Sequence, residues 1–264
     1  MTRFFSLAGL IVVCGLAACQ TAPTADSGFL SDYARLETVD GTVRASIRQH
    51  RDEGRAAMIE QVWLEPSVLA GAATMTTLTN DERDLVLREV DRQVCYEISE
   101  RFTLAASPTG AARVRTAVVR IGATAPAGSA VAAVANAFLP GPGTVRVPGT
   151  TGGLAAEAEL LDERGSQAAA IAWARDANVV GTDSPSLSRA GDALQMAEPF
   201  ADAVGDAFAP AERPVRAIPD PDPCGRYGPR TQPAGFLTRL VTGLYVPEVN
   251  TGAREDAPGE VPKP

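Results

Sequence analysis

Two long stretches of the chain place apolar residues every three or four positions, which is the spacing of one face of a helix. The first covers residues 79–101, where Thr79 followed by Glu82 has the pattern of a capping box. The second covers residues 183–208, with Asp183 as a capping residue at its start. The pattern therefore predicts two long amphipathic helices.

Shorter segments around these helices have the composition of β-strands, rich in β-branched and apolar residues. We expect strands at residues 57–64, 102–105, 112–121, 153–162 and 167–176. The turn at residues 163–166 contains Gly165 and predicts a hairpin between the last two strands. An uncharged apolar stretch at residues 128–138 predicts a shorter helix.

The ends of the chain are less regular. Residues 28–36 have apolar side chains at helical spacing and predict a short docked helical turn, whereas the charged residues 37–55 predict a loop. From residue 210 onward, 11 of the last 55 residues are Pro, which argues against packed regular structure. The element order predicts the α+β class: a mainly antiparallel sheet with two long helices and one shorter apolar helix packed on one face, plus a Pro-rich C-terminal tail.

The beginning of the chain has the pattern of an export signal. Arg3 precedes an uncharged apolar stretch over residues 4–18, which is shorter than the ~20 residues that a membrane-spanning helix needs. The junction that follows consists of Leu16, Ala17, Ala18 and Cys19. This quartet resembles the lipobox of bacterial lipoproteins, in which the cysteine receives fatty acyl chains such as palmitate and becomes N-terminal. We therefore expect Cys19 to be the lipidation site.

The lipobox resemblance implies a domain organisation and an address. We expect a signal peptide at 1–18, a flexible tether at 19–27, an α+β lipoprotein domain at 28–209 and a C-terminal extension at 210–264, docked over 224–246 and disordered at its end. Gln20, rather than the Asp typical of inner-membrane retention, favours the outer membrane, with the domain anchored through its lipid and facing the periplasm. The alternatives are an ordinary cleaved signal and an uncleaved anchor.

Charge and cysteine content narrow the classes of partner. The net charge is −8 and no basic stripe is present, so we expect no nucleic-acid partner. Cys14 is removed with the expected signal peptide and Cys19 is acylated, so two cysteines remain, Cys95 and Cys224. An even pair in the oxidising periplasm is expected to form a disulfide. The alternative is two free thiols.

Four stretches of the chain together resemble a bacterial lipoprotein family catalogued as domain of unknown function 3313. They cover residues 27–36, 62–66, 156–162 and 187–193. The resemblance extends over about residues 27–208, and residues 37–55 depart from the family pattern. It implies the envelope address and the fold, and it assigns no catalytic residue.

A search for catalytic or metal-binding groups finds little. His50 is the only histidine and stands among charged neighbours, so we expect a surface residue, and we expect no metal site and no cofactor. Glu157 and Glu159 share one strand face; they are either a catalytic carboxylate pair or part of a solvated sheet edge facing arginines on adjacent strands. The candidate arginines are Arg113, Arg115 and Arg175. Trp63 and Trp173 are expected to pack in the core rather than stack on sugars.

The sequence therefore favours a non-catalytic binding or assembly module, which contacts the membrane through its lipid and an unidentified envelope component through its surface. One short apolar segment could dock on its own domain, on a partner or on the membrane surface. Its residues are Phe236, Leu237, Leu240, Val241, Leu244 and Tyr245. The alternatives are a carboxylate-dependent hydrolase of cell-wall or lipid substrates and a small-ligand carrier.

Overall fold

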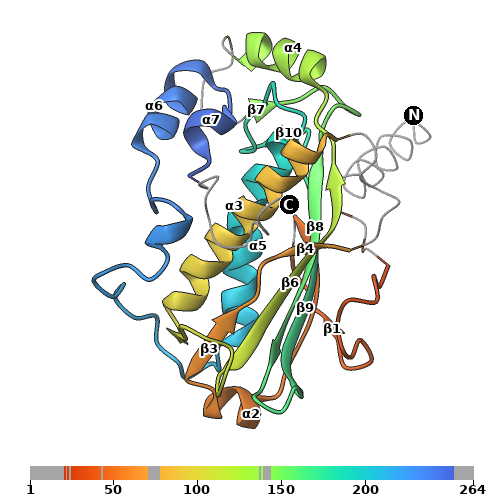
Figure 1. Cartoon of the computed structure of the whole chain (residues 1–264). Helices are drawn as coiled ribbons and strands as arrows, with labels where there is room; N and C mark the ends of the chain where they lie inside the picture. Colours follow the sequence, from red (N-terminus) through yellow and green to blue (C-terminus); the bar gives the residue numbers. More distant parts are fainter. Residues whose placement is uncertain are drawn as a thin grey trace, which may run out of the picture.

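The computed structural model of the chain is shown in Figure 1. The residues that the structure describes are 21, 23, 25–42, 44–70, 78–136, 138 and 144–252. The expected signal peptide and its junction, Leu16, Ala17, Ala18 and Cys19, lie outside these residues, as does the chain beyond residue 252.

The fold centres on one sheet of eight strands, in the spatial order β1-β2-β9-β8-β6-β3-β5 with β4 paired to β6. The strands are β1 (Glu37–Thr38), β2 (Ala45–Arg51), β3 (Gln61–Leu64), β4 (Val68–Leu69), β5 (Thr103–Leu104), β6 (Ala112–Gly122), β8 (Gly153–Leu161) and β9 (Gln167–Asp176). Neighbours from β1 across to β6 are antiparallel, whereas β3, β4 and β5 join by parallel pairing. The predicted α+β class with a mainly antiparallel sheet is confirmed.

Two helices, α3 (Asn80–Ser99) and α5 (Gly191–Phe208), lie side by side over one face of this sheet (Figure 1). The capping box predicted for the first helix is present: the Glu82 N–H donates to the Thr79 hydroxyl at 3.2 Å, and the Thr79 N–H donates to the Glu82 carboxylate at 2.8 Å. Both helices contribute buried apolar side chains to one core with the inner face of the sheet. Within it, the ring of Phe200 lies 5.7 Å from that of Trp173.

The second long helix begins at Gly191 and not at Asp183 as predicted. Asp183 binds the Arg175 guanidinium at 2.5 Å and so does not cap the helix. The following residues form a connection, in which Ser186 makes an isolated bridge with Tyr245. A capping residue can therefore be diverted by an arginine on a neighbouring strand, which local sequence does not reveal.

The N-terminal part of the domain is more regular than the sequence predicts. Residues 37–55, expected as a loop, contain β1, β2 and the start of α2 (Glu53–Met58). The strand predicted at 57–64 is correspondingly shortened to β3. The charged side chains of β2 made this stretch look like a loop in the sequence. The strand nevertheless pairs along its length with β9 through backbone hydrogen bonds, which do not depend on side-chain polarity. The helical turn predicted for residues 28–36 is absent, and these residues are extended with short turns.

The shorter apolar helix, α4 (Pro126–Asn136), lies at one end of the sheet and not over the face that carries α3 and α5 (Figure 1). It packs beside a separate two-stranded sheet made of β7 (Thr144–Val145) and β10 (Val180–Gly181). A buried ion pair between Arg146 and Asp192, with N–O distances of 2.5 and 2.9 Å, joins this small sheet to the start of α5.

The C-terminal extension contacts α3 through the 3-10 turn η2 (Gly225–Tyr227) and Cys224. It also contains two helices, α6 (Pro233–Thr242) and α7 (Pro247–Asn250). The predicted disulfide joins Cys95 to Cys224, with the two Cα atoms 5.8 Å apart. Beside it, the Tyr96 hydroxyl donates to the Gly228 carbonyl at 2.7 Å. The Pro-rich segment is thus held by one covalent and several polar contacts.

Removing the disulfide should lower the stability of the domain. The bridge closes a loop with a sequence separation of 129 residues, and loss of such a bridge costs about 2–5 kcal/mol. The double variant Cys95→Ser, Cys224→Ser should therefore unfold at a lower urea concentration than the oxidised native protein. The native protein with its disulfide reduced is the control and should match the variant; an unchanged midpoint in both would contradict this role.

Candidate functional site

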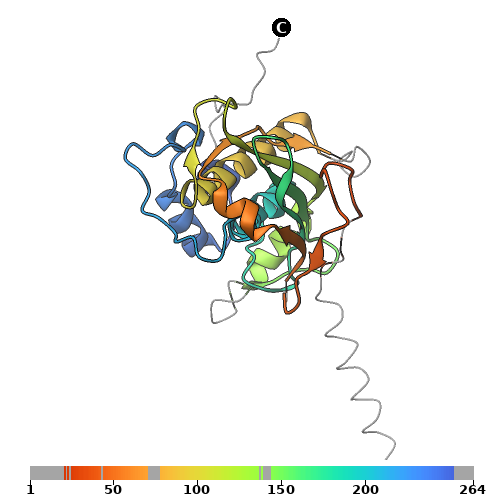
Figure 2. The same cartoon turned by 90° about the horizontal axis from the view of Figure 1, so that it is seen from below.

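The face of the sheet opposite α3 and α5 is covered by the start of the described chain, residues 21, 23 and 25–36, which we call the N-terminal segment. Figure 2 shows α3 and α5 on one side of the sheet and this segment on the other. At one end the Thr21 hydroxyl accepts a hydrogen bond from the N–H of Asp176, the last residue of β9, at 2.9 Å. At the other end Arg35 contacts Gln167, the first residue of β9. The segment therefore follows the full length of the central strands.

Glu157 on β8 is the first anchor of this segment. Its side chain faces away from the helices, and the residue is only 1% exposed. The hydroxyls of Ser27 and Tyr33 both donate to the same carboxylate oxygen, each at 2.6 Å. The Ser27 N–H donates to the other oxygen at 3.3 Å. Burial, and then the hydrogen bond to Glu157, raise the pKa of Tyr33, so its hydroxyl remains a donor.

Glu159, two residues along the same strand, is the second anchor and has no exposed surface. The Ser31 N–H donates to its carboxylate at 2.8 Å, and Arg115 on β6 donates at 2.7 Å. The Arg115 guanidinium also lies over the ring of Phe29, 4.8 Å from its centre. Buried carboxylates are stable only when paired and hydrogen-bonded, and the N-terminal segment supplies most of what these two need.

These contacts correct one part of the expectation for Glu157 and Glu159 and confirm another. The carboxylates lie on one strand face as predicted, but they are buried and do not form a solvated edge. Of the three candidate arginines, Arg115 is the partner of Glu159, whereas Arg113 pairs with Glu65 and Arg175 with Asp183. A catalytic pair needs access to substrate, and the N-terminal segment covers both groups.

The predicted flexible tether at 19–27 also differs from the structure. Thr21 and Ser27 are hydrogen-bonded as described, and Asp26 pairs with Arg48 on β2 at 2.5 Å. The stretch is polar and small, which suggests mobility when the sequence is considered alone. Its polar groups instead satisfy donors and acceptors on the sheet, so the described part of this stretch is docked.

The remaining residues singled out from the sequence lie apart from one another. His50 is half-buried on β2, and Trp63 is half-buried on β3. Trp173 is 2% exposed and belongs to the core, as expected. Within the ranges that the structure describes, no cluster of three or more His, Cys, Asp or Glu side chains is placed to hold a metal ion.

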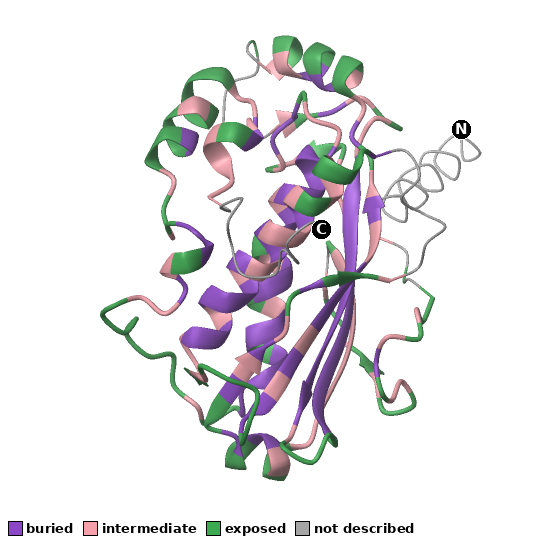
Figure 3. Ribbon diagram, in the orientation of Figure 1, coloured by how far each residue is buried: buried purple, intermediate pink, exposed green. Residues whose placement is uncertain are grey.

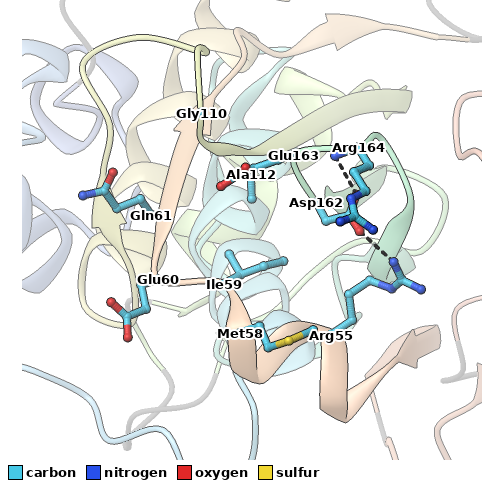
Figure 4. A pocket seen from close by; sticks show the side chains of 10 residues that line it. All are labelled: Arg55, Met58, Ile59, Glu60, Gln61, Gly110, Ala112, Asp162, Glu163 and Arg164. Carbon is cyan, nitrogen blue, oxygen red and sulfur yellow. Dashed lines mark hydrogen bonds and ion pairs between the residues drawn. The ribbon is translucent and has the colours of Figure 1, made fainter.

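A pocket of about 460 Å³ opens at the end of the sheet remote from α4, between α2 and the β8–β9 turn (Figure 4). Arg55 and Asp162 point toward each other there and form an ion pair at 2.6 Å. Burial alone would raise the pKa of Asp162, but hydrogen bonds from the Ser166 backbone and from Arg55 outweigh it and hold that pKa below its usual value. Asp162 therefore joins α2 to the β8–β9 turn, where it also accepts from the N–H groups of Arg164 and Ser166.

A second hollow, of about 490 Å³, lies between α5, α3 and the C-terminal extension. Its acid Asp202 has a pKa raised to about 6 by burial and by the negative charges of Glu97 and Glu198. Glu89, in the same hollow, is ion-paired with Arg92. The hydrolase hypothesis requires two acids of raised pKa in one pocket. In this hollow Asp202 has a raised pKa, Glu198 is one of the charges that raise it, and Glu89 is ion-paired.

The apolar segment predicted for docking divides into two parts. Tyr245 is buried, and its N–H donates to the Pro185 carbonyl at 2.9 Å, while Leu244 is half-buried. The other four residues lie on α6 and are 57–82% exposed: Phe236, Leu237, Leu240 and Val241. The end of the segment thus docks on its own domain, and α6 presents an apolar face to the outside.

The fold and the covered carboxylates define the class of protein: an α+β domain whose sheet is closed on one side by helices and on the other by its own N-terminal segment. A family model described as "Protein of unknown function (DUF3313)" matches residues 25–204, and the chain belongs to this family. The four stretches behind the family resemblance are in part joined to one another, because residues 27–36 bind Glu157 and Glu159 in stretch 156–162.

Comparison with solved structures finds PelC from Paraburkholderia phytofirmans, a dodecamer, in two crystal forms. One, a point variant, has 12% identity and a TM-score of 0.36, covering 64% of this chain and 99% of PelC. The other has 11% identity and a TM-score of 0.34, covering 61% and 94%. A likeness this distant carries no functional argument.

Comparison with curated proteins finds no match. Among the helices that the structure describes, none has both the length and the apolar composition to cross a bilayer.

Removing one donor to the first anchor should weaken the domain measurably. Tyr33→Phe keeps the ring but leaves a buried carboxylate with one hydrogen bond fewer, which should cost about 1.5–3 kcal/mol of unfolding free energy. Tyr227→Phe is the matched control, because its hydroxyl contacts the side chain of Arg226 and no carboxylate. Equal urea midpoints for the two variants would show that the anchor contributes little.

A half-buried acid on α3, Asp91, gives a second, pH-dependent test. Asp91 accepts a hydrogen bond from the Ser67 N–H at 2.8 Å, and burial raises its pKa to about 6. The native state then binds a proton more tightly than the unfolded state, so this group loses stabilising effect as pH rises from about 4 to above 6.

Asp91→Asn should therefore stabilise the protein at pH 8, by on the order of 1–3 kcal/mol, and have little effect at pH 4. Thermal unfolding at both pH values measures this difference. Asp84→Asn removes an exposed acid from the same helix and is the control. A gain that is the same at both pH values would show that Asp91 does not titrate as stated.

Proposed function

We propose that this protein is a lipid-anchored lipoprotein of the bacterial cell envelope, a non-catalytic binding or assembly module held at the outer membrane and facing the periplasm. The observation that carries the proposal is that Glu157 and Glu159 bind the N-terminal segment. The one carboxylate pair that the sequence offered for catalysis instead binds the segment that directly follows Cys19. The site fixes the domain to its own anchor.

The position of Thr21 explains how such an anchor would work. Two residues of extended chain span at most about 7 Å, so an acylated Cys19 lies within that distance of a residue hydrogen-bonded to β9. A single acyl chain binds a bilayer only marginally, but two or three chains bind firmly. The domain would then be held close to the membrane surface.

Two further observations support export. The Cys95–Cys224 disulfide suits the oxidising periplasm and is uncommon in the reducing cytosol. Gln20, next to the expected lipidation site, favours release to the outer membrane over retention at the inner membrane. The hydrolase alternative has lost its carboxylate pair to the N-terminal segment, which leaves binding as the better-supported role.

Fatty-acid labelling tests the anchor directly. In cells fed a clickable palmitate analogue, the native protein should be labelled and should fractionate with membranes. Cys19→Ser should abolish the label, whereas the matched variant Cys14→Ser, within the expected signal peptide, should retain it. Equal labelling of Cys19→Ser and the native protein would contradict the proposal.

A further inference from the structure

Exposed apolar side chains gather at the end of the molecule that carries α4 and α6. Of the 16 large hydrophobic residues described as exposed, ten lie in α4, α6 or the β7–β10 sheet or within two residues of them. Figure 3 shows both helices largely exposed at the upper end of the molecule. Four of these residues are neighbours on the single helix α6, and monomeric soluble proteins rarely expose a large apolar patch without an interaction that uses it.

Each of the two helices exposes large apolar side chains to the outside. On α4, Val131 and Val134 are 62% and 66% exposed, while Ser129 and Ala132 are buried against the domain. On α6, Leu240 is 71% exposed. Neither helix contains an acidic residue, and α6 contributes a single cation, Arg239, although the protein as a whole is acidic.

The attachment point of the chain lies at this same end. Thr21 is bonded to Asp176, and three residues later the Val179 carbonyl accepts from the N–H of Arg146, next to β7. On the other edge of β7, Asn136 at the end of α4 accepts from the Val145 N–H at 2.8 Å. A short series of contacts therefore connects the start of the described chain to α4.

The C-terminal extension reaches this end by a different route. Tyr245, just after α6, is bonded to Pro185, and Asp183 two residues earlier binds Arg175 at the end of β9. Both apolar helices are thus fixed to the end of the sheet from which the chain leads to Cys19.

We propose that these two helices form a membrane-contact surface, which lies on the bilayer beside the lipid anchor. The surface consists of Val131, Val134, Phe236, Leu237, Leu240 and Val241. The inference rests on the proposed lipidation of Cys19. An anchor within about 7 Å of Thr21 brings this end of the domain to the headgroups and raises the local concentration of lipid around it.

The residues of α4 and α6 themselves suit a bilayer surface; the nearest exposed acid on the adjacent α7 is Glu248. An anionic membrane repels carboxylates, and α4 and α6 present none. Arg239 lies on α6 among the apolar residues, where a cation can reach lipid phosphates while the apolar side chains enter the interface. The pocket shown in Figure 4 would then face away from the membrane, toward the periplasm.

Fluorescent labelling of the full lipidated protein in vesicles tests this orientation. Cys95 and Cys224 are bridged and Cys19 is acylated, so one new cysteine can carry a nitrobenzoxadiazole probe. We would label Val134→Cys and Leu240→Cys, with Met58→Cys as the matched control, which is 78% exposed on α2 at the opposite end. The vesicles contain phosphatidylethanolamine and phosphatidylglycerol, with or without a nitroxide-labelled lipid.

The proposal predicts that nitroxide lipid quenches the probes at positions 134 and 240 several-fold more than the probe at position 58. If the protein floats with the vesicles but none of the three probes is quenched, the lipid anchor holds and the contact surface is wrong. A blue shift without quenching would indicate a second copy or another protein on this surface and would likewise overturn it. Failure to float would overturn the proposed function and this inference together.

Discussion

The structure depends on two carboxylates buried on the face of the sheet that no helix covers. Burying Glu157 and Glu159 is costly unless their carboxylates are hydrogen-bonded. The N-terminal segment supplies donors through Ser27, Ser31 and Tyr33, and Arg115 and Gln167 complete the set around Glu159. The segment in turn is held by these hydrogen bonds together with the buried side chain of Leu30. Each part thus makes the other stable, and the result closes the second face of the sheet. This reciprocity explains why β8 and β9 are buried on both faces although no helix covers the second one.

Patterns of neighbouring residues in the sequence predicted the regular parts of this fold. The capping box of α3, the hairpin between β8 and β9 and the Cys95–Cys224 pairing all rest on residues close in sequence or on a count of two cysteines, and the structure confirms them. The α+β class followed from the order of these elements. Such features are determined by nearby residues, and so a single sequence is sufficient to predict them.

The features that were missed depend on partners far along the chain. β2 is a strand because β9 pairs with its backbone, and α5 starts late because Asp183 binds Arg175. The role of Glu157 requires Ser27, which is 130 residues away. One signal was present: the two stretches 27–36 and 156–162 both carried the family resemblance, and both contain polar residues in otherwise small or apolar surroundings. Their pairing, however, is a tertiary fact.

The central claim is that the segment following Cys19 is a fixed part of the domain. Amide hydrogen exchange at Ser31 tests it most directly, because this N–H donates to the buried Glu159 carboxylate and to no strand. The account predicts that the Ser31 amide exchanges as slowly as amides in the ladder between β8 and β9. Exchange at the rate of an unstructured peptide, while that ladder stays protected, would contradict it.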